Sequence, residues 1–203
     1  HRAHASVEAA PGLFAAGRKA CGRLMEMELD ALSCLMARSE RPFVALIGGA
    51  KVSTKTAPLE ALLERVDCLA IGGGMANTFL LARGLEVGSS LVEADMVDSA
   101  RAVYERAEAR GVELLMPEDV VVADAIDEPT RVETVAAAEV GSELAVVDIG
   151  PRTRERYRRA IEEARTVFWN GPMGVFEVER FGDGTMAVAQ ALAACQGFSV
   201  VGG

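Results

Sequence analysis

Short apolar runs alternate with amphipathic stretches along most of the chain. Apolar residues at helical spacing predict helices over residues 24–37, 57–66, 75–83, 94–110, 153–164 and 185–195. Runs of the length of buried strands cover residues 43–47, 68–71, 112–115, 120–123, 144–149, 166–169 and 198–201. The polar stretch between 124 and 143 predicts no regular element. This alternation favours right-handed crossovers between parallel strands.

The predicted fold class is therefore α/β: a doubly wound, mostly parallel sheet with helices on both faces, as in Rossmann-like three-layer domains. In such sheets a ligand binds outside the carboxyl ends of the strands. The loops that follow the strands are the places in which to look for function.

Glycines gather in those loops. They follow five of the predicted strands, as Gly48-Gly49, Gly72-Gly73-Gly74, Gly150-Pro151, Gly171-Pro172-Met173-Gly174 and Gly202-Gly203. Glycine lets the backbone approach a ligand closely, and a following helix N-terminus directs N–H groups at an anion. If all five lie on one edge of the sheet, they predict a cradle for phosphate or nucleotide. Tight packing between strand and helix is the alternative use of these glycines.

Lys51 and Lys55 follow the first predicted strand and are four residues apart. A helical turn there would place both side chains on one face, beside a helix N-terminus. Phosphoryl transfer needs positive charge aimed at the transferring oxygens. The spacing therefore indicates a catalytic pair, with a solvated lysine pair as the alternative.

The amino-acid composition limits the kinds of partner that the chain can bind. Lys and Arg number 21 and Asp and Glu 30, so the net charge is 21 − 30 = −9. That charge opposes non-specific binding to nucleic acid or anionic membranes. No apolar run reaches the roughly 18 residues that a membrane span requires. The four cysteines are widely spaced without a Cys-x-x-Cys pair, which argues against zinc or a disulfide framework and favours a reducing cytoplasm.

Three motifs together resemble the phosphoglycerate kinase family. They are Gly48-Gly49-Ala50-Lys51-Val52-Ser53-x-Lys55, Ile71-Gly72-Gly73-Gly74-Met75-Ala76 and Trp169-Asn170-Gly171-Pro172-Met173-Gly174-Val175-Phe176-Glu177. His1-Arg2-Ala3-His4 is similar to the end of that family's N-terminal domain, and the resemblance covers residues 1–203. It implies a glycolytic kinase that transfers the acyl phosphate of 1,3-bisphosphoglycerate to ADP, giving ATP and 3-phosphoglycerate.

The resemblance also implies roles for single residues. Lys55 would contact the transferring phosphate with Lys51 in support, and Arg2 would hold 3-phosphoglycerate. Glu177 would take the ribose hydroxyls. The other residues implied to contact the nucleotide are Gly72, Gly73, Leu91, Asn170, Pro172, Gly174 and Gly203. No protein metal ligand is predicted in the chain: Mg²⁺ would arrive with the nucleotide, its protein ligand lying beyond Gly203.

Both ends are expected to be interior sequence of a longer protein. The predicted division is 1–20 for the end of an N-terminal domain and the interdomain segment, and 21–203 for an incomplete nucleotide-binding domain. We therefore expect the parent to be a monomeric cytoplasmic enzyme, and the chain by itself to be inactive.

Two other functional hypotheses stay open. A non-catalytic nucleotide-binding module would have the same pocket without chemistry. A nicotinamide-dependent dehydrogenase could share the layers, but the chain lacks the glycine spacing of the dinucleotide fingerprint. Titration with ATP, ADP and NADH separates the dehydrogenase from the other two.

Overall fold

The computed structural model describes residues 9–15 and 17–202. The chain divides into two compact units, His1–Arg38 and Ser39–Gly203, which are described separately. The first contains the short helix α1 (Ala10–Gly12) and the long helix α2 (Arg23–Arg38), which confirms the helix predicted over 24–37. The predicted domain boundary between residues 20 and 21 stays a prediction.

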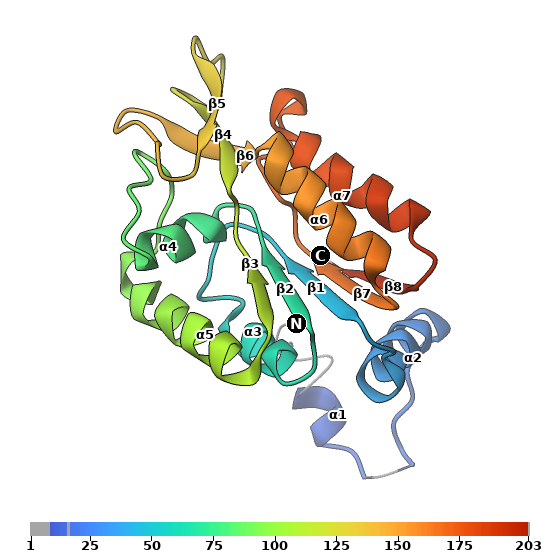
Figure 1. Cartoon of the computed structure of the whole chain (residues 1–203). Coiled ribbons are helices and arrows are strands. Elements are labelled where there is room, and N and C mark those ends of the chain that lie inside the picture. Colours follow the sequence, from blue (N-terminus) through green and yellow to red (C-terminus); the bar gives the residue numbers. More distant parts are fainter. Residues whose placement is uncertain (1–8, 16, 203) are drawn as a thin grey trace. The chain divides into compact units, whose positions relative to one another are not determined.

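A five-stranded sheet forms the centre of the second unit (Figure 1). Its spatial order is β3-β2-β1-β7-β8, and every neighbouring pair is parallel. The strands are β1 (Phe43–Ile47), β2 (Cys68–Ile71), β3 (Glu113–Leu115), β7 (Thr166–Asn170) and β8 (Phe198–Gly202). All residues of β1 and β2 are buried, as expected of central parallel strands covered on both faces.

Helices cover both faces of this sheet, so the predicted fold class is confirmed. Figure 1 shows them in two groups, one on each side of the sheet. The first group is α3 (Thr56–Leu63), α4 (Met75–Ala82) and α5 (Val97–Arg110), with the 3-10 turn η2 (Ala94–Met96) before α5. The second group is α6 (Pro151–Glu163) and α7 (Asp183–Ala194), with η3 (Glu179–Phe181) before α7. In the part of the chain that the structure describes, no helix is long and apolar enough to cross a bilayer.

The core between the sheet and the second helix group includes Tyr157, which is among the largest fully buried side chains in the described residues. Tyr157 of α6 is fully buried beside Val44, Val167 and Val188. Its hydroxyl donates to the Ile71 carbonyl oxygen at 2.6 Å, so the buried polar atom is satisfied. Burial of this apolar surface supplies the main stabilisation, at roughly 25 cal/mol per Å².

A second, smaller sheet stands beyond the carboxyl ends of the first. It contains β4 (Asp119–Ala123) between β5 (Val132–Ala136) and β6 (Ala145–Ile149), and both pairings are antiparallel. Two expectations were wrong here. The runs at 120–123 and 144–149 do not join the parallel sheet, and the polar stretch at 124–143 contains a strand. Only residues 116–118 separate β3 from β4, too few for the crossover that a parallel neighbour requires.

The antiparallel sheet is linked to α6 through Asp119 at the start of β4. Its carboxylate accepts from the Thr153 backbone N–H at 2.8 Å and the Thr153 hydroxyl at 2.7 Å, in the first turn of α6. A Cβ at Gly150 would collide with that carboxylate. Gly150 therefore serves this packing, and its prediction as part of a glycine row on the parallel sheet was wrong.

Candidate nucleotide-binding site

Backbone hydrogen bonds join three glycine-containing loops at the carboxyl edge of the parallel sheet. The Gly49 N–H donates to the Pro172 carbonyl oxygen at 2.9 Å, which connects the loops after β1 and β7. The Gly73 N–H donates to the Met173 carbonyl oxygen at 2.9 Å, which connects the loops after β2 and β7. Segments on the order of a hundred residues apart in sequence thus form one continuous surface.

Gly73 is a position where no other residue fits. Its φ is +66°, and a Cβ there would lie 2.6 Å from the Gly49 backbone nitrogen. At Gly72 an added Cβ would press on the sulfur of the flexible Met173 side chain, while the other Met173 atoms near it lie at ordinary contact distance. Gly72 is not among the residues that line the pocket described next, and its role as a nucleotide contact stays a prediction.

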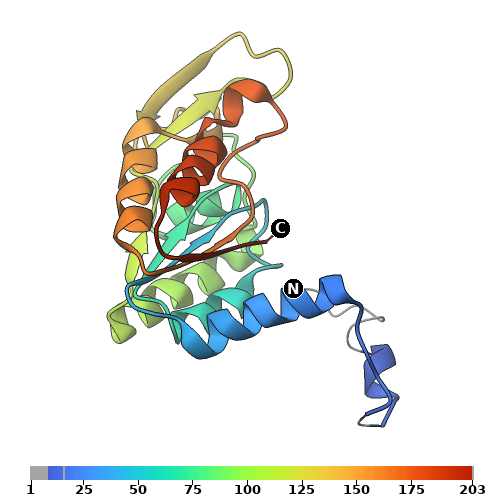
Figure 2. The same cartoon turned by 90° about the vertical axis from the view of Figure 1, so that its right-hand side faces the viewer.

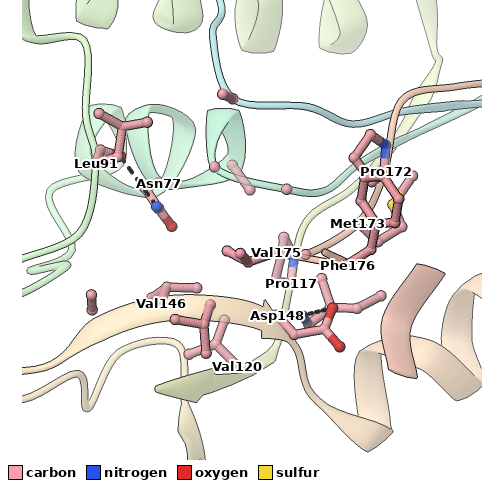
Figure 3. A pocket seen from close by; sticks show the side chains of 18 of the residues that line it. Asn77, Leu91, Pro117, Val120, Val146, Asp148, Pro172, Met173, Val175 and Phe176 are labelled. Carbon is pink, nitrogen blue, oxygen red and sulfur yellow. Dashed lines mark hydrogen bonds between the residues drawn. The ribbon is translucent and has the colours of Figure 1, made fainter. Parts of the chain in front are cut away.

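A pocket of about 660 Å³ lies between this loop surface and the antiparallel sheet (Figure 3). One wall comes from residues after β1, β2 and β7, and the opposite wall from β4 and β6. Its lining residues are Gly49, Ala50, Gly73, Gly74, Ala76, Asn77, Leu80, Ser89, Leu91, Pro117, Val120, Ile126, Ala145, Val146, Val147, Asp148, Ile149, Pro172, Met173, Gly174, Val175, Phe176 and Glu177.

The side chains around the pocket are mainly apolar. Figure 3 places Val120 and Val146 on the antiparallel sheet, across the space from Leu91 and Val175. Apolar walls with a few oriented polar groups are typical of small-molecule sites. The pocket therefore suits a flat apolar group, such as a nucleotide base, better than it suits the phosphates.

Positive charge is placed beside the pocket rather than inside it. Lys55 directly precedes α3, and its ammonium group donates a hydrogen bond to Oδ1 of Asn170 at the end of β7. The structure thus brings together two residues that are 115 positions apart in sequence. A lysine next to glycine loops and a helix N-terminus makes a favourable place for an anion.

The predicted stacking of Lys51 with Lys55 on a helix face was wrong. Residues 51–55 form a turn, closed by the Lys55 N–H donating to the Val52 carbonyl oxygen at 2.8 Å, and α3 begins only at Thr56. Lys51 is exposed, and its charge helps to favour the ionised form of Glu93, whose pKa is lowered. Val52 is buried and holds the turn against the core instead.

Glu93 connects the lysine turn to helix α4, and sequence reasoning missed it. Its two carboxylate oxygens accept from the Ser53 backbone N–H at 3.0 Å and the Ser53 hydroxyl at 2.6 Å. Desolvation opposes ionisation of this carboxyl, but the Ser53 hydrogen bonds outweigh it, so its pKa lies below the usual value. The Glu93 N–H in turn donates to the Thr78 hydroxyl of α4 at 3.1 Å. No spacing in the sequence indicates this contact.

Asp148 is a buried carboxylate at the back of the pocket, with 2% of its surface exposed. It accepts from the Ile149 N–H at 2.8 Å and from the Gly184 N–H, at the start of α7, at 2.7 Å. Burial raises the pKa of this carboxyl to about 6, although the two N–H groups and Arg154 favour its ionised form. A Cβ at Gly174 would collide with it, which explains the glycine there.

The predicted site residues are distributed as follows. Five line the pocket: Gly73, Leu91, Pro172, Gly174 and Glu177. Lys55 and Asn170 contact each other beside it, Gly72 lies next to Met173 and Lys51 stands on the exposed turn. Arg2 and Gly203 fall outside the described residues. Pocket residues that were not predicted include Asn77, Val120, Met173 and Phe176.

By its fold the chain is a member of the α/β class with a doubly wound, mostly parallel sheet, and its glycine loops border a pocket at the carboxyl edge. The family model for phosphoglycerate kinase matches residues 1–203. The chain belongs to the phosphoglycerate kinase family.

Individual relatives agree with this assignment. The chain is 53% identical to a phosphoglycerate kinase of Thermus thermophilus and 51% identical to that of Herpetosiphon aurantiacus, in matches that cover 100% of the chain. It covers 52% and 51% of those two proteins, so it spans about half their length. The solved phosphoglycerate kinase of Coxiella burnetii matches 90% of the chain with a TM-score of 0.87 and 44% identity, and the match covers 47% of that protein.

Proposed function

We propose that this chain is the nucleotide-binding part of a phosphoglycerate kinase and binds ADP or ATP at the carboxyl edge of its parallel sheet. The observation that carries the proposal is the Lys55 to Asn170 hydrogen bond on the glycine loops, beside an apolar pocket of about 660 Å³. A base in the pocket would point its phosphates towards that pair. The remaining assignments follow this orientation.

The parent reaction moves a phosphoryl group between two oxygens. An oxygen of the ADP β-phosphate attacks the phosphorus of the acyl phosphate, and the bond from that phosphorus to the carboxyl oxygen breaks. ATP and the carboxylate of 3-phosphoglycerate result, with no redox change. Such a reaction depends on positioning and on positive charge near the transferring oxygens. In our proposal Lys55 supplies that charge, and Lys51 adds a more distant one from the turn.

The other predicted residues receive roles in keeping with their places. Gly73, Leu91 and Pro172 line the base and ribose region, and Gly174 lets the loop after β7 pass over Asp148. Glu177 is exposed at the pocket rim, where a carboxylate can accept from the ribose hydroxyls. We retain Gly203 as a nucleotide contact and Arg2 as a contact for 3-phosphoglycerate on the basis of the family motifs alone.

Mg²⁺ is proposed to arrive with the nucleotide phosphates. Within residues 9–15 and 17–202, no three His, Cys, Asp or Glu side chains gather in a way that would hold a metal ion. Mg²⁺ commonly binds through one or two carboxylates together with substrate phosphates, and no step of our proposal passes through the metal ion. We also propose a cytoplasmic, monomeric parent that binds neither nucleic acid nor membranes, in keeping with four free cysteines and a net charge of −9.

Nucleotide titration of the ¹⁵N-labelled chain tests the proposal. ADP and ATP should shift amide signals of the loops at 48–55, 72–74 and 170–177, whereas NADH should not. Shifts confined to the opposite edge of the sheet, or none at millimolar ADP, would contradict it. A coupled assay for ATP formation should find no turnover by the chain alone. Turnover that is absent in Lys55→Ala would refute this last expectation.

A further inference from the structure

Asn77 places a polar atom in the otherwise apolar surroundings of the pocket. It is the third residue of α4, and 1% of its surface is exposed. Its side-chain nitrogen donates to the Leu91 carbonyl oxygen at 3.2 Å. Figure 3 shows the amide with its nitrogen towards Leu91 and its oxygen turned to the pocket interior.

The orientation of this amide follows from hydrogen bonding. A carbonyl oxygen can only accept, so the NH₂ end must face Leu91 and the oxygen must face away. The Leu91 segment is itself held in place two residues later, where the Glu93 N–H donates to Thr78 at 3.1 Å. The direction of the Asn77 oxygen is thus determined by the hydrogen bond to Leu91 and by the contact that holds the Leu91 segment in place.

That oxygen lacks a partner. Among the residues that the structure describes, Oδ1 of Asn77 is the buried side-chain polar atom for which no hydrogen bond is found. Buried polar atoms without a partner are rare, because desolvating them is unfavourable. An orphaned acceptor that faces a ligand pocket indicates that a ligand donor satisfies it.

The surroundings of this acceptor limit the ligand group that it can meet. Leu80, Leu91 and Val146 line the same pocket and offer only apolar side chains. A flat aromatic ring with one N–H donor at its edge would match both the walls and the acceptor. A purine with an amino group at C6 has that form. A purine with a carbonyl oxygen at C6 would instead place a second hydrogen-bond acceptor against the Asn77 oxygen.

We propose that Asn77 is a specificity-determining residue that accepts a hydrogen bond from the C6 amino group of the purine base. The inference rests on the proposed function, because it assumes that a nucleotide base occupies this pocket. It assigns the residue no part in phosphoryl transfer. Asn77 selects the base, while Lys55 and Asn170 lie at the phosphate end of the site.

The test compares ADP with purine riboside 5′-diphosphate, which carries hydrogen in place of the C6 amino group. Calorimetry on the chain should find ADP bound about tenfold more tightly, as one hydrogen bond to a buried acceptor warrants. In Asn77→Leu, which keeps a similar volume without an acceptor, the two affinities should agree within about twofold. Val146→Ala is the control, because it should weaken both ligands by the same factor.

The outcomes separate the two proposals. A purine riboside diphosphate that binds the wild-type chain as tightly as ADP, or an unchanged tenfold preference in Asn77→Leu, overturns the role of Asn77 and leaves the proposed function standing. A wild-type chain that binds neither ligand at millimolar concentration overturns both. Asn77→Ala provides the same comparison if Asn77→Leu fails to fold, and the wild-type preference alone can already refute the inference.

Discussion

The two sheets border the pocket with different kinds of chemical groups. The parallel sheet contributes backbone and charge: glycine loops after β1, β2 and β7, and Lys55 bonded to Asn170. The antiparallel sheet contributes apolar side chains such as Val120 and Val146, with Asp148 buried behind them. In Figure 2 the antiparallel strands stand above the parallel sheet, beyond the ends at which its loops lie.

In our proposal this contrast corresponds to the two halves of a nucleotide. Phosphates need N–H groups and cations, which the ends of parallel strands and helix N-termini provide. A base needs a flat apolar slot with a few polar contacts, which side chains on the face of a small sheet provide. The following variants test whether the two regions divide the work in this way.

The largest effect is expected at the phosphate side. In the full-length enzyme, Lys55→Ala should lower kcat roughly 10²–10³-fold, as loss of one preorganised positive group does, with a much smaller change in ADP affinity. Steady-state kinetics and ADP titration measure the two quantities. Glu177→Gln, at the pocket rim, should instead act mainly on the nucleotide KM. Equal effects of both variants on the same parameter would contradict the division.

A backbone variant of the parallel edge should mainly affect stability. Gly73→Ala combines a positive φ with a clash against Gly49, and we expect a loss of about 3 kcal/mol in the free energy of unfolding. Gly111→Ala is the matched control, because Gly111 has φ +68° but no atom within 4 Å of an added Cβ. It should lose only about 1 kcal/mol. Urea unfolding of both variants measures these two losses. Equal losses would show that small shifts of neighbouring atoms relieve the clash with Gly49.

The prediction for the antiparallel sheet concerns how the stability of the chain depends on pH. Burial raises the pKa of the Asp148 carboxyl to about 6, so its contribution to stability is complete below its ordinary value of 3.8 and is lost as the pH rises through 6. Between pH values of about 7.5 and 5 the chain should gain about 1 kcal/mol from this group. Thermal unfolding across this range measures the gain.

Two controls accompany this measurement. Asp148→Asn should flatten the gain, and it should also be less stable, because an amide offers one acceptor oxygen where the carboxylate offers two to the Ile149 and Gly184 N–H groups. Asp119 behaves in the opposite direction: desolvation opposes its ionisation, but hydrogen bonds from Thr153 and Arg152 keep its pKa below the ordinary value. Its stabilisation should therefore disappear on acidification. A gain that persists unchanged in Asp148→Asn would assign it to another group.

The smallest effect is expected at Glu93, which joins the lysine turn to α4. Glu93→Gln leaves one oxygen for the two Ser53 donors, so the lysine turn should become less well held against the pocket. We expect ADP affinity to fall about threefold with little change in unfolding, as loss of one partly exposed hydrogen bond implies. Ser53→Ala should reproduce the change. A much larger loss in Glu93→Gln with none in Ser53→Ala would indicate that Glu93 itself contacts the ligand.

Much of the site was accessible from sequence, and the misses have a common cause. The glycine loops lie directly after buried strands, and Lys55 lies in the connection between β1 and α3, where topology already places it. Residues of the other wall such as Val120 and Ala145 look like any strand residues, and Asn77 looks like an ordinary helix residue. Their role depends on which element stands opposite, and no local pattern records that.

By itself, the sequence determined the helices, the parallel strands, the loops that carry the residues proposed to contact phosphate, and membership of the family. These depend on hydrophobic period, on glycine and on short motifs, which are local properties. Only the tertiary structure decided that β4 and β6 leave the parallel sheet, that residues 51–55 turn before α3 begins, and that the oxygen of Asn77 faces the pocket. Each of these results from pairing between segments far apart in the chain, where packing and hydrogen-bond satisfaction select one arrangement among several that local preferences allow.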